Sequence, residues 1–65
     1  MIQLTRFNGS EFVVNADLIK FLEQTPDTVV TLTSGEKMLV KEKVEEIVRR
    51  AVQYHRALRY FPDGA

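Results

Sequence analysis

The chain has 65 residues, of which nine are basic and nine acidic, with one histidine and no cysteine. A chain of this length forms one small domain, which buries only about 60% of the surface that its unfolded form exposes. The absence of cysteine excludes disulfides, thiolate nucleophiles and sulfur-ligated zinc, and one histidine excludes a histidine-rich metal site, so oligomerisation remains as the usual means of stabilisation.

The first predicted element is a β-hairpin with strands at about residues 2–6 and 11–15. Its apolar residues are even-numbered, namely Ile2, Leu4, Phe12 and Val14. Because strand side chains alternate between faces, these residues share one face only if the loop has an odd number of residues. A three-residue loop at 7–9, with Gly9 in the left-handed conformation, meets this condition. It pairs Leu4 with Phe12 and Ile2 with Val14.

The tripeptide Asn8-Gly9-Ser10 fits both a glycan acceptor of a secreted chain and a tight β-turn. The N-terminal segment has no basic region followed by an apolar stretch, as a signal peptide would. The longest apolar run has three residues, against the roughly 20 that cross a bilayer. We therefore expect a cytoplasmic protein without membrane insertion, in which Asn8 and Gly9 are turn residues.

The next ten residues are compatible with two structures. A short helix capped by Asp17 fits the spacing of the apolar residues, whereas a strand would turn Ile19 and Phe21 inward. Because so short a segment makes a poor free-standing helix, we favour a turn at Asn15–Asp17 and then a strand at about residues 19–23.

A second hairpin follows, with strands at about residues 28–33 and 37–41. Its inward-facing residues are again even-numbered, namely Val30, Leu32, Met38 and Val40. A three-residue loop that ends at Gly35 pairs Val30 with Met38. In front of the hairpin, Pro26 and Asp27 favour a turn.

Residues 42–60 are predicted to form one amphipathic helix, followed by a tail at 61–65. The apolar stripe of this helix consists of Val44, Ile47, Val48, Ala51, Val52, His55 and Leu58, at steps of three and four residues. The chain therefore predicts a single α+β domain over residues 1–65, in which the helix lies on the apolar face of antiparallel strands.

Charged residues on the predicted helix follow its polarity. Glu42, Glu45 and Glu46 lie in the first turns, where the positive end of the helix dipole favours carboxylates. Glu45 and Glu46 each have an arginine four residues later, Arg49 and Arg50, so we expect two i,i+4 ion pairs.

The sequence contains no constellation typical of catalysis. His55 lies on the apolar stripe, where a hydrogen-bonded core or edge histidine is the ordinary interpretation, and Ser10 and Ser34 accompany turn glycines. We therefore expect no enzyme, no cofactor, no metal and no small-molecule substrate.

The segment from Lys41 to Tyr60 contains six basic residues and three glutamates, a net charge of +3. Its arginines alternate with Tyr54 and Tyr60, as in surfaces that bind nucleic-acid backbones. Residues 19–47 are also similar to LytTR-type DNA-binding domains in their strand–hairpin–helix order. A small nucleic-acid-binding regulator is therefore the alternative function, although the zero net charge and the glutamate partners favour a solvated helix face.

The stretch LTRFNG, followed by Asn15 and by TPDTVVTLTSGEKMLVKE, resembles the FlbD family of small flagellar proteins, also called SwrD. The resemblance covers about residues 1–55 and leaves the end of the chain, 59–65, outside it. The matching motif positions are Leu4, Thr5, Arg6, Asn8, Gly9, Asn15, Pro26, Asp27, Thr28, Gly35 and Glu42. The family attaches no catalytic or cofactor role to them.

The resemblance implies a short protein at the cytoplasmic face of the flagellar base. Such a protein supports swarming by raising motor power at the level of the stators and does not build the filament. We therefore expect a non-enzymatic interaction protein whose partner is a motor or stator component. We also expect a homo-oligomer, because a small core and unpaired strand edges favour self-association.

The candidates for partner binding are Arg6, Asn15, Asp27, Arg49 and Arg50, and the residues assigned to turns are Asn8, Gly9, Pro26 and Gly35. Arg6 shares the apolar face of the first hairpin, where a bare charge is costly. Its side chain is expected either to snorkel to the rim or to meet a carboxylate of a second subunit.

Overall fold

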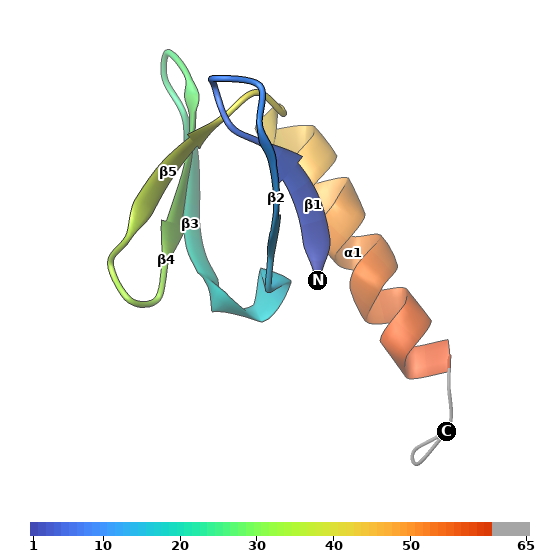
Figure 1. The fold of residues 1–65 in the computed structure, drawn as a ribbon. Helices are drawn as coiled ribbons and strands as arrows, with labels where there is room; N and C mark the ends of the chain where they lie inside the picture. Colours follow the sequence, from blue (N-terminus) through green and yellow to red (C-terminus); the bar gives the residue numbers. More distant parts are fainter. Residues whose placement is uncertain (61–65) are drawn as a thin grey trace.

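The computed structural model describes the backbone of residues 1–60 and the side chains of residues 1–58, so the predicted tail at 61–65 lies outside the described residues. Five strands and one long helix form an α+β fold (Figure 1). The elements are β1 (Ile2–Thr5), β2 (Glu11–Val14), a 3-10 turn η1 (Ala16–Leu18), β3 (Ile19–Gln24), β4 (Thr28–Leu32), β5 (Lys37–Val40) and α1 (Val44–Tyr60).

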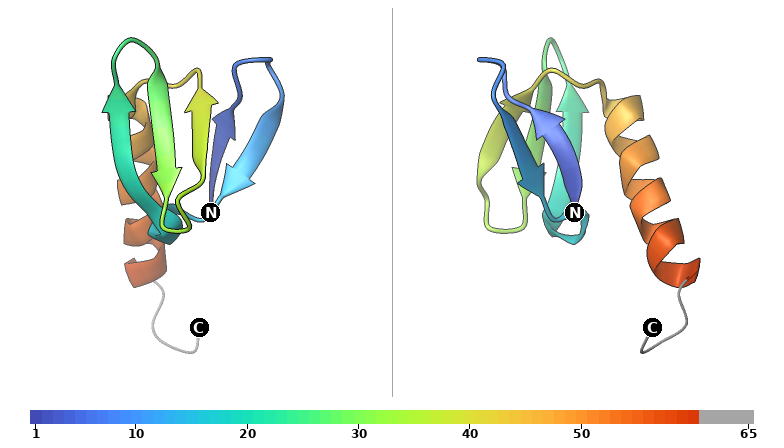
Figure 2. Two further views of the ribbon diagram at one scale, coloured as in Figure 1. Left: turned by 90° about the vertical axis from the view of Figure 1, so that its left-hand side faces the viewer. Right: turned by 45° about the vertical axis from the view of Figure 1, so that its right-hand side comes forward.

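The strands form two antiparallel sheets, β1-β2 and β3-β4-β5. A bridge between Arg6 and Val40 connects them, and Lys41 N donates to Thr5 O at 2.9 Å beside it. Five strands therefore lie side by side in the order β3, β4, β5, β1, β2, with α1 behind them (Figure 2). The helix contacts β1 and β3.

The register of both hairpins confirms the prediction. Leu4 lies opposite Phe12 and Ile2 opposite Val14, while Val30 lies opposite Met38. The loop glycines, Gly9 and Gly35, have φ angles of +94° and +93°, as three-residue hairpin loops require. In the β3–β4 turn the peptide bond between Thr25 and Pro26 is cis.

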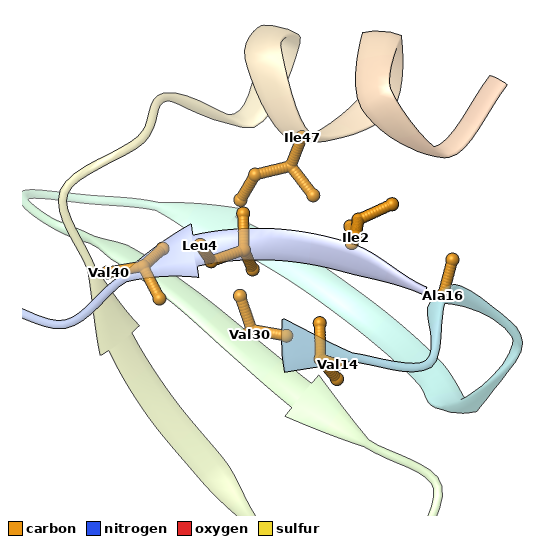
Figure 3. Packing of buried hydrophobic residues seen from close by; sticks show 7 residues of the cluster. All are labelled: Ile2, Leu4, Val14, Ala16, Val30, Val40 and Ile47. Atoms are coloured by element: carbon orange, nitrogen blue, oxygen red, sulfur yellow. The ribbon is translucent and has the colours of Figure 1, made fainter. Parts of the chain in front are cut away.

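The hydrophobic core lies between the strands and the helix (Figure 3). Its buried members are Ile2, Leu4, Val14, Ala16, Val30, Val40 and Ile47. All but Ala16 come from positions that the parity of the hairpins and the helical stripe placed inside.

The segment after β2 forms a turn and then a strand, as favoured above, but two details differ. Asn15, not Asp17, caps η1, since Asn15 Oδ1 accepts a hydrogen bond from Asp17 N at 3.0 Å. Phe21 was expected inside and is 55% exposed. The register against β4 shifts by one residue between Ile19 and Phe21. This shift turns Leu22 inward, onto the core, and Phe21 outward.

The helix begins at Val44, two residues later than predicted. Gln24 Oε1 of β3 accepts a hydrogen bond from Val44 N at 2.8 Å, which satisfies one free donor of the first turn. The predicted stripe is wider than the surface that the strands cover. The exposed residues on it are Val48, Val52, His55 and Leu58. The half-buried Tyr54 packs against the core in their place.

Candidate functional site

Three connecting segments meet at one end of the molecule, which we call the loop end: the β1–β2 turn (6–10), the β3–β4 turn (25–27) and the β5–α1 connection (41–43) (Figure 1, top). They meet because successive strands run in opposite directions, so alternate connections share an end. An open cavity of about 330 Å³ lies here, and all three segments contribute to its lining. Its lining includes the exposed side chains of Phe7, Pro26, Asp27, Lys41 and Lys43.

The loop end gathers most of the positions that carry the family resemblance. Those within or directly beside its three segments are Thr5, Arg6, Asn8, Gly9, Pro26, Asp27, Thr28 and Glu42. Asn15 and Gly35 lie toward the opposite end, in η1 and the β4–β5 loop. Leu4 is fully buried in the core.

Local hydrogen bonds shape the first turn of the loop end. Asn8 Oδ1 accepts from Ser10 N at 2.9 Å and from Ser10 Oγ at 2.8 Å, and Gly9 N donates to Arg6 O at 2.9 Å. The Arg6 guanidinium lies 4.3 Å from the centroid of the Phe12 ring. The Arg6 side chain therefore packs over the Phe12 ring, and the residue is exposed to solvent. Its contact with a carboxylate of a second subunit stays a prediction. The turn formed by these hydrogen bonds presents the exposed side chain of Phe7.

Glu42 connects the helix side of the loop end to β1. Its Oε1 accepts from Thr5 N at 2.9 Å, and its Oε2 accepts from Thr5 Oγ1 at 2.8 Å. Burial acts to raise the pKa of Glu42, but the Thr5 hydrogen bonds and the Arg50 charge outweigh it and hold that pKa below its usual 4.5. Glu42 was expected in the first turn of the helix. It lies before the helix instead and accepts two hydrogen bonds from Thr5.

Arg49 and Arg50 share one carboxylate, that of Glu46. Arg50 Nε donates to Glu46 Oε2 at 2.7 Å and Arg49 Nε to Glu46 Oε1 at 3.1 Å, which lowers the pKa of Glu46 to about 2 through the hydrogen bonds of Arg49 and then of Arg50. The predicted pair between Glu46 and Arg50 is confirmed. The predicted pair between Glu45 and Arg49 is wrong, because Glu46 is also one turn from Arg49 and takes it.

These ion pairs bear on the two functions weighed above. Arg50 also donates to Gln3 O at 2.6 Å, so its guanidinium joins α1 to β1. Two of the arginines on which a nucleic-acid surface would depend are thus bound to carboxylates. The side chains of Arg59 and Tyr60, on which it would also depend, lie outside the described part of the chain.

A second open cavity, of about 520 Å³, lies between η1 and the exposed side of α1. His55 Nε2 and Asp17 Oδ1 are 2.8 Å apart at its edge, and both side chains are exposed. Val52 and Leu58 add apolar surface to the lining. His55 is thus a hydrogen-bonded residue at the edge of the fold and not part of the core.

Residues 1–60 contain no helix with the length and hydropathy of a membrane span. Within the same part of the chain, no cluster of three or more histidine, cysteine, aspartate or glutamate side chains could hold a metal ion.

Sequence reasoning missed several residues of this site. Phe7, Lys41 and Lys43 lie in loops, where no periodicity marks them, and only the meeting of the loops shows that they are neighbours. The contact between Glu42 and Thr5 joins residues 37 positions apart. The shared motif positions were the available signal for Thr5 and Glu42.

Comparison with known proteins identifies a family. The family model FlbD, described as flagellar and swarming motility proteins, matches residues 1–58. No curated protein and no solved structure matches the chain significantly.

Proposed function

The chain belongs to the FlbD family of flagellar and swarming motility proteins, and we propose that it supports the power of the flagellar motor by binding a motor protein at the stator. Its family gives it a role in flagellar and swarming motility, and that family is not one of enzymes. The proposal adds a mode of action, which is protein–protein interaction through the loop end.

The single observation that best supports this surface is the gathering of the motif positions around an exposed aromatic ring. Phe7 stands at the tip of a turn and is 48% exposed. A large apolar side chain on a loop held by Asn8 and Ser10 is a typical anchor for a protein partner, since it loses little conformational entropy on binding.

The charges of the loop end favour an acidic partner. Lys41 and Lys43 are exposed at the cavity, and the positive end of the α1 dipole begins directly after Lys43. Asp27 is the opposing carboxylate of the same lining, while the Glu42 carboxylate is occupied by Thr5 and Arg50. We infer an acidic segment of the partner that also presents an apolar side chain to Phe7.

The experiment replaces Phe7 by alanine and, separately, Lys41 and Lys43 by glutamate in the motile host. Torque is measured from the rotation of beads attached to flagellar stubs, and filaments are counted after staining. Each variant is expected to lower torque toward that of the gene deletion while the number of filaments stays unchanged.

The matched control is Lys37→Glu, which reverses an exposed charge on β5, away from the loop end. It is expected to leave torque unchanged. A deletion that removes filaments, or one that leaves torque intact, would contradict a role in motor power. Equal losses for Lys37→Glu and the loop-end variants would contradict the choice of surface.

A further inference from the structure

The helix has a second apolar row that the fold does not cover. Val48 and Val52 are 46% and 42% exposed, whereas Ile47 is fully buried. Successive helical residues point about 100° apart, so the packing that turns Ile47 toward the strands turns Val48 to the side. We call the row Glu45, Val48, Val52 and His55 the helix seam.

The spacing of the helix seam is that of a helix–helix contact. Its members follow each other at steps of three, four and three residues, the heptad spacing of two packed helices. A single exposed valine needs no explanation. Val48 and Val52, with Glu45 before them and His55 after them, instead form a stripe onto which the apolar stripe of a second helix can pack.

The charges at the two ends of the seam identify the second helix and its direction. Glu45 lies at the start and Arg56 at the end, beside His55; both are exposed, and neither is in an ion pair with another residue whose side chain is described. A second copy packed antiparallel places Val48 against the partner's Val52 and Glu45 against the partner's Arg56. A parallel copy would place like charges together, which is unfavourable.

We propose that two copies of this chain associate through their helix seams, antiparallel and related by a two-fold axis. Each dimer then contains two contacts between Val48 and Val52 and two between Glu45 and Arg56, as an isologous interface requires. The cavity beside Val52 and Leu58 lies next to the seam, so the partner helix also covers part of its apolar lining. None of the four seam residues lines the cavity at the loop end. The inference is therefore independent of the proposed function.

The first test measures the mass of the full chain by sedimentation equilibrium over a range of concentrations. The mass is expected to rise from the monomer's 7.5 kDa toward twice that value. Val52→Asp is expected to hold the mass at that of the monomer across the range. The matched control is Val13→Asp, which makes the same substitution at an exposed valine outside the helix seam. Val13 is 62% exposed and lies on the edge strand β2.

The outcomes separate this interface from the alternatives. A chain that stays monomeric throughout overturns the proposal. Dissociation by Val13→Asp but not by Val52→Asp overturns it in favour of strand-edge pairing. Both variants are expected to stay folded, because Val52 and Val13 are exposed. Circular dichroism spectra that match that of the unaltered chain check this.

The second test uses the charges and leaves the apolar contacts in place. Glu45→Arg alone and Arg56→Glu alone are each expected to weaken the dimer about tenfold or more, because each brings like charges together twice. Mixing the two variants restores opposite charges at both contacts, so the mixture is expected to dimerise like the unaltered chain. A mixture that stays as weak as either variant overturns the antiparallel arrangement, because that arrangement places opposite charges at both contacts of the mixed dimer. Single variants that dimerise as well as the unaltered chain overturn it too, because a parallel pair has like charges together before and after either change.

Discussion

Among the single residues of the fold, Glu42 makes the contact that ties the helix connection to the first strand. Its side chain is only 11% exposed, and it accepts two hydrogen bonds from Thr5. We expect Glu42→Ala to lower the free energy of unfolding by about 2 kcal/mol, because two partly buried donors of Thr5 lose a charged acceptor. Urea unfolding, monitored by circular dichroism, measures this change in the free energy of unfolding. Glu36→Ala, at an exposed loop position, is the control and should change stability by no more than about 0.5 kcal/mol.

The carboxylates of Glu42 and Glu46 also make stability depend on pH. The pKa of Glu46 is about 2 in the folded chain, against an ordinary value of 4.5, and that of Glu42 is lowered as well. Between these values the unfolded chain binds more protons, so stability increases with pH. The contribution is complete above about pH 4.5 and is lost as the pH falls toward 2.

Thermal unfolding from pH 7 down to pH 2 checks this dependence. The midpoint is expected to fall mainly below pH 4.5, and Glu46→Gln should flatten that part of the curve. Added salt should flatten it too, because Arg49 and Glu46 are partly exposed and their attraction is screened. A midpoint that falls equally in the Glu46→Gln variant would show that other groups cause the loss.

At the level of elements, the hairpins were the most predictable part of the chain. Even-numbered apolar residues and a loop glycine determine register together, since a shift of one residue would turn every apolar side chain outward. The position of Phe21 was not predictable in this way, because the register shift beside it depends on how β3 pairs with β4. The apolar stripe of the helix also does not indicate which of its two sides the strands will cover. Val48 and Val52 lie on the side that the strands leave exposed.

The loop glycines allow a direct test of the hairpin geometry. A Cβ added at Gly9 or Gly35 would have no atom within 4 Å, so any cost of Gly→Ala arises from the backbone and not from a clash. With φ near +94° and +93°, we expect each alanine variant to be less stable by about 1–2 kcal/mol. Asparagine, which tolerates positive φ better, should cost less at both positions. Equal costs for alanine and asparagine in thermal unfolding would contradict this explanation.

At the level of the whole molecule, one small core must stabilise both sheets and the helix. Among the described side chains, seven buried apolar residues form that core. The bridge between Arg6 and Val40, the Glu42 contact and the Arg50 contact join its layers at the rim. So small a domain is expected to be only marginally stable alone. Association through the helix seam would therefore contribute a measurable share of the stability of the folded chain.

This share can be measured without determining any mass. If only the folded chain dimerises, mass action makes the unfolding midpoint rise with protein concentration. We expect such a rise for the unaltered chain between micromolar and millimolar concentrations, and no rise for Val52→Asp, which keeps the core but lacks the seam. At low concentration the two midpoints should converge, because the dimer is then dissociated in both. A midpoint independent of concentration in the unaltered chain would mean that the fold is sustained by its own core alone.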